Sequence, residues 1–343
     1  MKIRAAISAI EYHLPRNALS NDQLAREFPE WGIEKIEEKT GISIRYVADE
    51  DEHASDLGVA AVQRLFDKGV CRPDDIDFLL FCTQSPDYFL PSTACIMQER
   101  LGIPKRSGAL DFNLGCSGFV YGLGLAKGLI ETGQAQNVLL VTAETYSKYL
   151  DPSDKGVRAL FGDAGAATLI QSTSGQHRES GCLSGPFVYG TDGQGAQNLI
   201  VPFEGMRCSE HPDKKQAGRN QSRIMPSAGS LYMNGPEVFT FTLTAVPKAI
   251  KELLACSGKT LDDISLFVFH QANKYILDHL RRKIGIPENK FYLSLHYGNT
   301  VSATIPIALK HAWKEGKLQS GQLVVLVGFG VGYSWGATLI EWV

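Results

Sequence analysis

Three residues of the chain, Cys116, His270 and Asn299, have the side chains of a thiol acyl-transfer site. A cysteine can attack a thioester carbonyl and hold the acyl group, while histidine and asparagine can donate hydrogen bonds to a developing oxyanion. Each also has a structural interpretation, as a buried packing cysteine, a hydrogen-bonded histidine or a turn-capping asparagine. A cysteine followed far downstream by histidine and asparagine favours a nucleophile with two positioned donors.

The surroundings of Cys116 predict a strand-to-helix turn. Residues 109–114 form a short apolar run that we expect to be a buried strand, and apolar residues at helical spacing cover 119–130. Gly115 and Gly118 leave the backbone room to approach a ligand closely. At a helix N-terminus, unpaired N–H groups and the helix dipole favour thiolate over thiol, so we expect a lowered thiol pKa for Cys116.

His270 and Asn299 also lie where chemistry is expected. His270 follows the apolar strand at 266–269, and Asn299 lies in a polar loop that leads into an apolar helix. In α/β sheets, sites gather at the carboxyl ends of strands. A glycine-rich segment, GFGVGYSWG at 328–336, follows another apolar strand, and its N–H groups are expected to point into the site.

Internal similarity predicts two related α/β units. PDDIDFLLFCTQ at 73–84 matches LDDISLFVFHQA at 261–272, and GAATLI at 165–170 matches WGATLI at 335–340. We therefore expect one half at 1–172 that carries the cysteine and another at 173–343 that carries the histidine and asparagine. Residues 171–230, rich in Gly, Ser, Gln and Asn, are expected to form loops around a substrate entrance.

Periodicity and capping residues place the regular elements. Expected helices lie at 20–28, 34–40, 55–68, 93–101 and 238–256. Expected strands, several of them continuous apolar runs typical of parallel sheets, lie at 3–10, 76–82, 138–142, 266–269 and 323–328.

Composition excludes several classes of protein. With 343 residues, 44% hydrophobic and 21% charged, the chain has the make-up of an ordinary soluble globular protein. A net charge of -3 gives no footprint for nucleic acid. The apolar stretch in residues 1–15 is too short and too interrupted for us to expect a signal peptide, and no apolar run reaches membrane length. The seven cysteines, without CxxC or metal-like spacing, fit a reducing compartment. We expect a cytoplasmic protein that binds neither metal, membrane nor nucleic acid.

Four motifs together resemble the β-ketoacyl-acyl-carrier-protein synthase III family of the thiolase superfamily. They are DFNLGCSGF around Cys116, HQAN at 270–273, YGNTVSATIPIAL at 297–309 and FGVGYSWGATLI at 329–340. The likeness extends from LP at 14–15 and KTGI at 39–42 through MNGPEVF at 233–239 to the C-terminus. It implies a thiolase-like α/β fold, with two pseudo-repeated βαβαβαββ halves in five αβαβα layers, and a homodimer.

The resemblance also implies a reaction in fatty acid or related biosynthesis. Cys116 would take an acyl primer from coenzyme A or acyl carrier protein, with the N–H groups of Cys116 and Val331 as oxyanion hole. His270 Nε2 and Asn299 Nδ2 would stabilise the enolate left when a malonyl thioester loses CO2. The phosphopantetheine arm would pass Asn273, with Phe239 also binding substrate, and no cofactor would be needed.

Several positions depart from the family pattern. Val331 replaces a usual glycine, Leu90 replaces the aromatic that crosses the dimer interface to bound the acyl pocket, and Tyr146 stands at another wall position. Lys35 aligns with the tryptophan that stacks on adenine, although Trp31 is nearby, and Lys39 and Lys155 replace nucleotide-binding arginines. At the carrier-protein docking site Tyr275 replaces a basic residue, while positive charge is kept by Lys274, Arg281, Arg282 and Lys283.

Three other functions use the same fold. An acyltransferase or non-decarboxylative condensing enzyme of secondary metabolism or surface-polysaccharide assembly could employ the same three residues, and release of CO2 would distinguish it. A non-catalytic subunit of a heterodimeric condensing enzyme would be expected to lack the nucleophile, which is present here. A thiolase is disfavoured because it needs a second catalytic cysteine in the C-terminal glycine loop.

Overall fold

The structure, a computed structural model, describes residues 3–30, 32–173, 181–202 and 229–343. Two sheets share one strand arrangement, in which three parallel strands are followed by two antiparallel ones. The first has the order β5 (Gly108–Phe112), β4 (Phe78–Cys82), β6 (Asn137–Glu144), β7 (Ala164–Ser172) and β1 (Ala5–His13). The second has the order β13 (Phe291–Tyr292), β12 (Leu266–Phe269), β14 (Leu323–Gly330), β15 (Ser334–Trp342) and β9 (Phe187–Thr191).

This arrangement confirms the internal repeat. The matching segments at 73–84 and 261–272 contain β4 and β12, and those at 165–170 and 335–340 lie in β7 and β15. Each pair occupies the same place in its sheet. A short strand, β8 (Gly181–Cys182), pairs with both β1 and β15 and so joins the sheets edge to edge. The boundary between halves at residue 172 stays a prediction.

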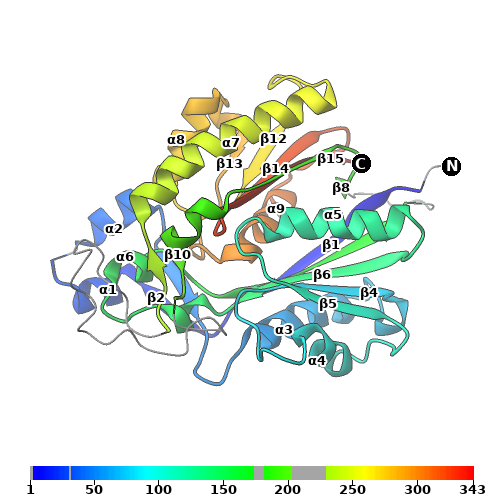
Figure 1. Cartoon of the computed structure of the whole chain (residues 1–343), viewed down its shortest axis with the longest axis horizontal. Coiled ribbons are helices and arrows are strands. Elements are labelled where there is room, and N and C mark those ends of the chain that lie inside the picture. The colour runs from blue at the N-terminus through cyan, green and yellow to red at the C-terminus, as the bar shows by residue number, and fades with distance from the viewer. Residues whose placement is uncertain (1–2, 31, 174–180, 203–228) are drawn as a thin grey trace.

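Helices pack on both faces of each sheet and give the expected five layers (Figure 1). The outer layers are α3 (Ala54–Asp67) with α4 (Thr93–Arg100), and α7 (Gly235–Ser257) with α8 (Lys274–Ile284). The middle layer consists of α5 (Gly118–Glu131) and α9 (Thr304–Lys314). Strand residues alternate between layers, since Leu79 and Phe81 pack against the outer helices while Leu80 faces the middle ones.

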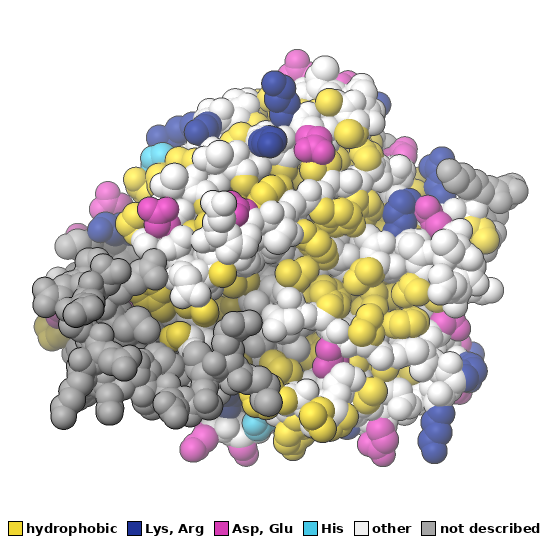
Figure 2. All heavy atoms as spheres, viewed as in Figure 1, with side chains coloured by type: hydrophobic (Ala, Val, Ile, Leu, Met, Phe, Trp, Pro, Cys, Tyr) yellow, Lys and Arg dark blue, Asp and Glu magenta, His cyan; other side chains and the backbone are white. Residues whose placement is uncertain are grey.

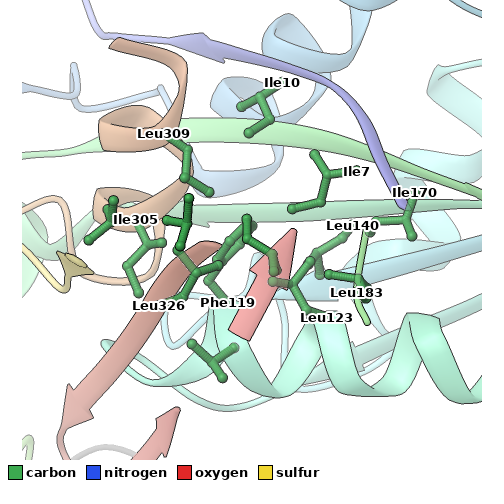
Figure 3. Close-up of a cluster of buried hydrophobic side chains, with 14 of the residues drawn as sticks. Ile7, Ile10, Phe119, Leu123, Leu140, Ile170, Leu183, Ile305, Leu309 and Leu326 are labelled. Atoms are coloured by element: carbon green, nitrogen blue, oxygen red, sulfur yellow. The ribbon is translucent and has the colours of Figure 1, made fainter. Parts of the chain in front are cut away.

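The middle layer forms a core shared by both halves (Figure 3). Phe119 and Leu123 of α5 and Ile305 and Leu309 of α9 lie in one cluster with side chains from both sheets. The periodicity that predicted a helix after Cys116 therefore marks the face that packs between the sheets. Gly133, with φ of 78°, follows the helix in the left-handed conformation.

Replacing Phe119 by alanine should lower the free energy of unfolding by about 3–5 kcal/mol, because the ring is fully buried at this centre. Denaturant titration of both proteins measures the change. Leu125→Ala on the same helix is the control, and because Leu125 is 45% exposed its effect should stay within roughly 0.5–1 kcal/mol. Equal losses in the two variants would contradict the assignment of the core.

The remaining expected helices and strands are confirmed to within a few residues. Ser20 caps α1 (Asn21–Glu27), and Gly41 ends α2 (Ile33–Thr40). Shorter elements complete the described chain: β2 (Asn17–Ser20), β3 (Ile44–Val47), α6 (Lys155–Arg158), β10 (Leu199–Ile200) and β11 (Tyr232–Met233). Much of the loop region expected at 171–230 lies outside the described residues.

One strand differs from its prediction. The segment at 109–114 was expected to be buried, yet β5 is an edge strand with a partly exposed surface, and Leu110 is 45% exposed. A continuous apolar run does not distinguish a central strand from an edge strand whose apolar side chains are covered by other elements or by another chain. Within the described residues, no helix has the length and apolar character needed to cross a membrane.

Candidate active site

Cys116 lies in the turn between β5 and α5, at the wall of a cavity of about 460 Å³. The glycine segment after β14 packs directly against it. A Cβ on Gly330 would lie 2.8 Å from Cys116 Sγ, so only glycine permits this approach. The close packing brings the N–H of Val331, together with that of Cys116 itself, to the thiol, where both lower its pKa.

The pKa of the Cys116 thiol is raised, whereas the sequence led us to expect a lowered pKa. Burial first, and then the nearby Glu144 carboxyl, raise it to about 12, although the two N–H groups lower it. The thiol is only 8% exposed, and loss of water outweighs the favourable position near the helix start. Cys116 is therefore protonated at neutral pH in the empty site.

His270 follows β12 and is fully buried at the same cavity. Burial lowers its pKa to about 3, so the ring is neutral. Its Nδ1 lies 2.7 Å from Thr304 Oγ1, which lies 3.1 Å from the Val301 carbonyl oxygen. The Thr304 hydroxyl can donate to either neighbour, so Nε2 can be either a donor or an acceptor.

Asn299 is the third residue at this cavity, and a tight turn fixes its amide. The N–H of Val301 donates to Asn299 Oδ1 over 3.0 Å. This bond occupies the oxygen and leaves Nδ2 as the group available to a ligand. Val301 has φ of 53°, an outlier for a β-branched residue, and such strain is concentrated at functional sites.

The cavity that joins the three residues is lined almost entirely by apolar atoms. Phe239 of α7 and Asn273, which caps α8, lie along it, and Tyr275 stands 52% exposed. The Phe239 and Tyr275 rings are 5.4 Å apart. Such a passage suits a long, thin, mostly uncharged chain ending at Cys116.

The chain matches two family models that together contain all three residues. Residues 110–193 match the model described as 3-oxoacyl-[acyl-carrier-protein (ACP)] synthase III, and residues 254–342 match the model of its C-terminal part. The β-ketoacyl-[acyl-carrier-protein] synthase III of Clostridium perfringens strain ATCC 13124 is 38% identical over 331 residues, which cover 96% of each chain. The chain belongs to the β-ketoacyl-acyl-carrier-protein synthase III family.

Solved structures agree with this membership. A crystal structure of a 3-oxoacyl-(acyl-carrier-protein) synthase III is 50% identical, with a TM-score of 0.91, and the match covers 98% of this chain and 99% of that one. The 3-oxoacyl-(acyl-carrier protein) synthase from Burkholderia xenovorans LB400 is 36% identical with a TM-score of 0.88, covering 99% and 94%. The thiolase-like fold is therefore shown, and members of this synthase III family are condensing enzymes of the transferase class.

The structure distributes the other predicted synthase III site residues over three places. Tyr146 and Val331 pack in the same cluster as Cys116. Leu90 is 82% exposed and far more open than a pocket wall. Lys39 is exposed on α2, and Lys155 forms an ion pair with Glu30 over 2.7 Å. Lys35 is also part of α2, and Trp31 falls outside the described residues.

The predicted docking residues lie on α8. Lys274, Arg282 and Lys283 are exposed there, whereas Arg281 turns back toward the Ile286 carbonyl and Glu288. Lys and Arg side chains are visible at the upper left of the molecule in Figure 2, where Figure 1 shows α8. The exposed side of α8 therefore carries positive charge, as the sequence predicts, but Arg281 adds less exposed charge to it because this side chain is partly buried and bonded within the chain.

The sequence patterns did not point to three polar residues next to the site, Thr304, Ser302 and Glu144. Thr304 contacts His270, and Ser302 donates to the buried carboxylate of Glu144. The available signal was Glu144 itself, an acidic residue directly after the apolar run at 138–142. Among the described residues, no cluster of histidine, cysteine or carboxylate side chains could hold a metal ion.

Proposed function

We propose that this chain catalyses the decarboxylative Claisen condensation of an acyl thioester primer with malonyl-acyl-carrier protein. The observation that carries the proposal is the convergence of Cys116, His270 and Asn299 on one apolar cavity. The cysteine comes from the first half and the other two residues from the second. Two backbone N–H groups also reach the thiol.

In the first half-reaction the thiol of Cys116 attacks the primer carbonyl. His270 Nε2, as acceptor, takes the thiol proton and passes it to the departing thiolate of coenzyme A or carrier protein. The carbonyl oxygen becomes negative and accepts hydrogen bonds from the N–H groups of Cys116 and Val331. The C–S bond of the primer breaks, and an acyl-cysteine remains.

In the second half-reaction a malonyl thioester enters the same cavity. Its carbonyl oxygen accepts hydrogen bonds from Asn299 Nδ2 and from His270 Nε2. Between the half-reactions the imidazole exchanges its proton with water, so that Nε2 now carries it and Nδ1 accepts from the Thr304 hydroxyl. Loss of CO2 leaves an enolate at those donors. Its carbon attacks the acyl carbonyl, the bond to Cys116 Sγ breaks, and the thiolate takes a proton from solvent water. Apart from that proton and the exchange at His270, these steps use groups of the chain and its substrates.

Intact-mass measurement tests the whole sequence. Incubation with acyl thioesters should add one acyl group, and malonyl-carrier protein should then remove it with release of one CO2 and formation of a 3-oxoacyl product. Acylation followed by transfer without CO2 would instead support the non-decarboxylative acyltransferase.

Dimerisation would cover an exposed apolar surface. Among the described residues β5 pairs only with β4 and leaves one sheet edge open. The loop before α4 exposes Tyr88, Phe89 and Leu90 by 62%, 78% and 82%. Large exposed apolar groups beside an unpaired strand edge are typical of a surface that binds another chain. In a homodimer Leu90 would reach the partner's acyl pocket, as the family pattern implies.

The residues at the acyl pocket favour a primer other than acetyl. A second cavity, of about 230 Å³, is lined by Tyr146 and Val331, which also pack around Cys116. Leu90 would offer it less bulk than an aromatic ring. At the two positions where the family pattern has nucleotide-binding arginines, Lys39 and Lys155 give charge without the planar fork of arginine, and Lys155 already pairs with Glu30.

We therefore expect acetyl-coenzyme A to acylate Cys116 at least about tenfold more slowly than a medium-chain acyl group on carrier protein, since roughly 1.4 kcal/mol of lost binding gives that factor. The Leu90→Phe variant should show a smaller difference between these two acylation rates. The measurement is the rate of acylation for each chain length on each carrier. Fast, saturable acylation by micromolar acetyl-coenzyme A would show that the inference from these substitutions is wrong.

A further inference from the structure

A fully buried carboxyl group outside the proposed chemistry lies behind the site. Glu144 ends β6 and is 0% exposed. Oε2 accepts hydrogen bonds from Gln84 N at 2.9 Å, Ser85 Oγ at 3.2 Å and Thr83 Oγ1 at 3.4 Å, and Oε1 accepts from Ser302 Oγ at 2.8 Å. No lysine, arginine or histidine among the described residues forms an ion pair with it.

The bond to Ser302 ties Glu144 to the turn that orients both enolate donors. Ser302 lies between Asn299, whose amide is fixed by Val301 N, and Thr304, which holds His270 Nδ1. The turn belongs to the second half of the chain and Glu144 to the first. A contact across the halves therefore holds a backbone segment that includes the positive φ of Val301.

The charge of Glu144 also acts on the nucleophile. Burial raises the pKa of Cys116, of Cys82 at the end of β4 and of Tyr146 after β6, and the Glu144 carboxylate raises each of these pKa values further. Burial raises the pKa of Glu144 to about 8, so its protonation changes close to neutral pH.

We infer that Glu144 is a positioning residue with two effects: through Ser302 it holds the turn that aims Asn299 and His270, and, once ionised, its buried carboxylate without a cationic partner disfavours the nearby Cys116 thiolate. The second effect sets in as Glu144 loses its proton above neutral pH, and it slows reactions of the free thiol because thiolates rather than thiols are alkylated and oxidised. The first effect rests on the proposed function, whereas the second concerns the free protein.

Three variants separate these effects. Glu144→Gln removes the charge with little change of shape, and Ser302→Ala removes the tie to the turn while keeping the charge. Asp163→Asn is the matched control, because Asp163 is an equally buried carboxylate that accepts bonds from Ala48 and Ser147 and not from the turn.

The readouts are iodoacetamide alkylation of the Cys116 peptide against pH, and condensation of pre-acylated enzyme. E144Q should lower the midpoint of Cys116 alkylation by about one pH unit or more, the usual scale for a nearby like charge. S302A should leave that midpoint unchanged and slow condensation about tenfold, the scale of one lost hydrogen bond. D163N should change neither.

An unshifted midpoint in E144Q, or an equal shift in D163N, would overturn the electrostatic effect. Normal condensation by S302A would overturn the positioning effect. If E144Q did not fold, the wild-type profile still decides: ionisation of Glu144 should make the alkylation rate rise less than tenfold per pH unit between about pH 7 and 9. A full tenfold rise throughout would contradict the charge effect.

If the wild-type enzyme never condenses its substrates, the proposed function fails, while the result of the alkylation experiment still stands.

Discussion

Cys116→Ala should form no acyl-enzyme and should lower condensation by at least about 10⁴-fold, the scale of removing a catalytic nucleophile. No other described cysteine lies at the cavity to replace it. The fold should persist, because alanine removes only one sulfur atom from a wall that already borders open space. Intact mass after incubation with a primer thioester measures acylation, and circular dichroism checks the fold.

Cys82→Ala is the matched control, since Cys82 is also buried nearby and its thiol donates to the Leu114 carbonyl oxygen over 2.8 Å. This variant should still be acylated. Decarboxylation of malonyl thioester should continue in Cys116→Ala, because it uses His270 and Asn299. Stoichiometric acylation of Cys116→Ala would show that the nucleophile lies elsewhere.

The second large effect concerns the enolate donors. Asn299→Ala should be acylated within a few-fold of the wild-type rate yet lose condensation by roughly 10²-fold or more, the scale of removing one oxyanion donor. His270→Ala should lose at least as much condensation and also acylate more slowly, because it loses the acceptor for the thiol proton. Single-turnover rates of the two half-reactions separate these outcomes.

The pH dependence supplies an independent check on His270. Because burial lowers its pKa to about 3, the ring is neutral above that pH, and condensation should show no step near pH 6.5. A rate that falls as a group of pKa near 6.5 becomes protonated would contradict the neutral ring. Condensation at the wild-type rate by both Asn299→Ala and His270→Ala would show that these two residues do not stabilise the enolate.

The sequence predicted most helices and strands because their signals are local. Apolar runs marked the central strands, and Ser20 and Gly41 marked helix ends. The repeated segments predicted that β4 and β12 hold equivalent places in the two halves. Cys116 and His270 could be found because each follows a strand at an edge where the fold gathers site residues, and Asn299 because it lies in a polar loop that leads into an apolar helix.

Other properties depend on contacts between distant segments. The direction of the Cys116 pKa depends on how completely the Gly330 segment and the Glu144 side chain enclose it, which no local pattern encodes. Likewise, the pairing of Lys155 with Glu30 joins residues from two separate elements. The partial exposure of β5 reflects its place at the end of a sheet rather than its own composition.

The shared middle layer has a consequence for synthesis on the ribosome. The apolar face of α5 emerges early, but its partners Ile305, Leu309 and Leu326 come from the last part of the chain. At about 5–20 residues per second, translation of the intervening segment takes on the order of ten seconds or more. Throughout that time Phe119 and Leu123 lack half of their final neighbours, so the nascent chain presents a helix that chaperones or neighbouring polysomes can bind before the enzyme can close over it.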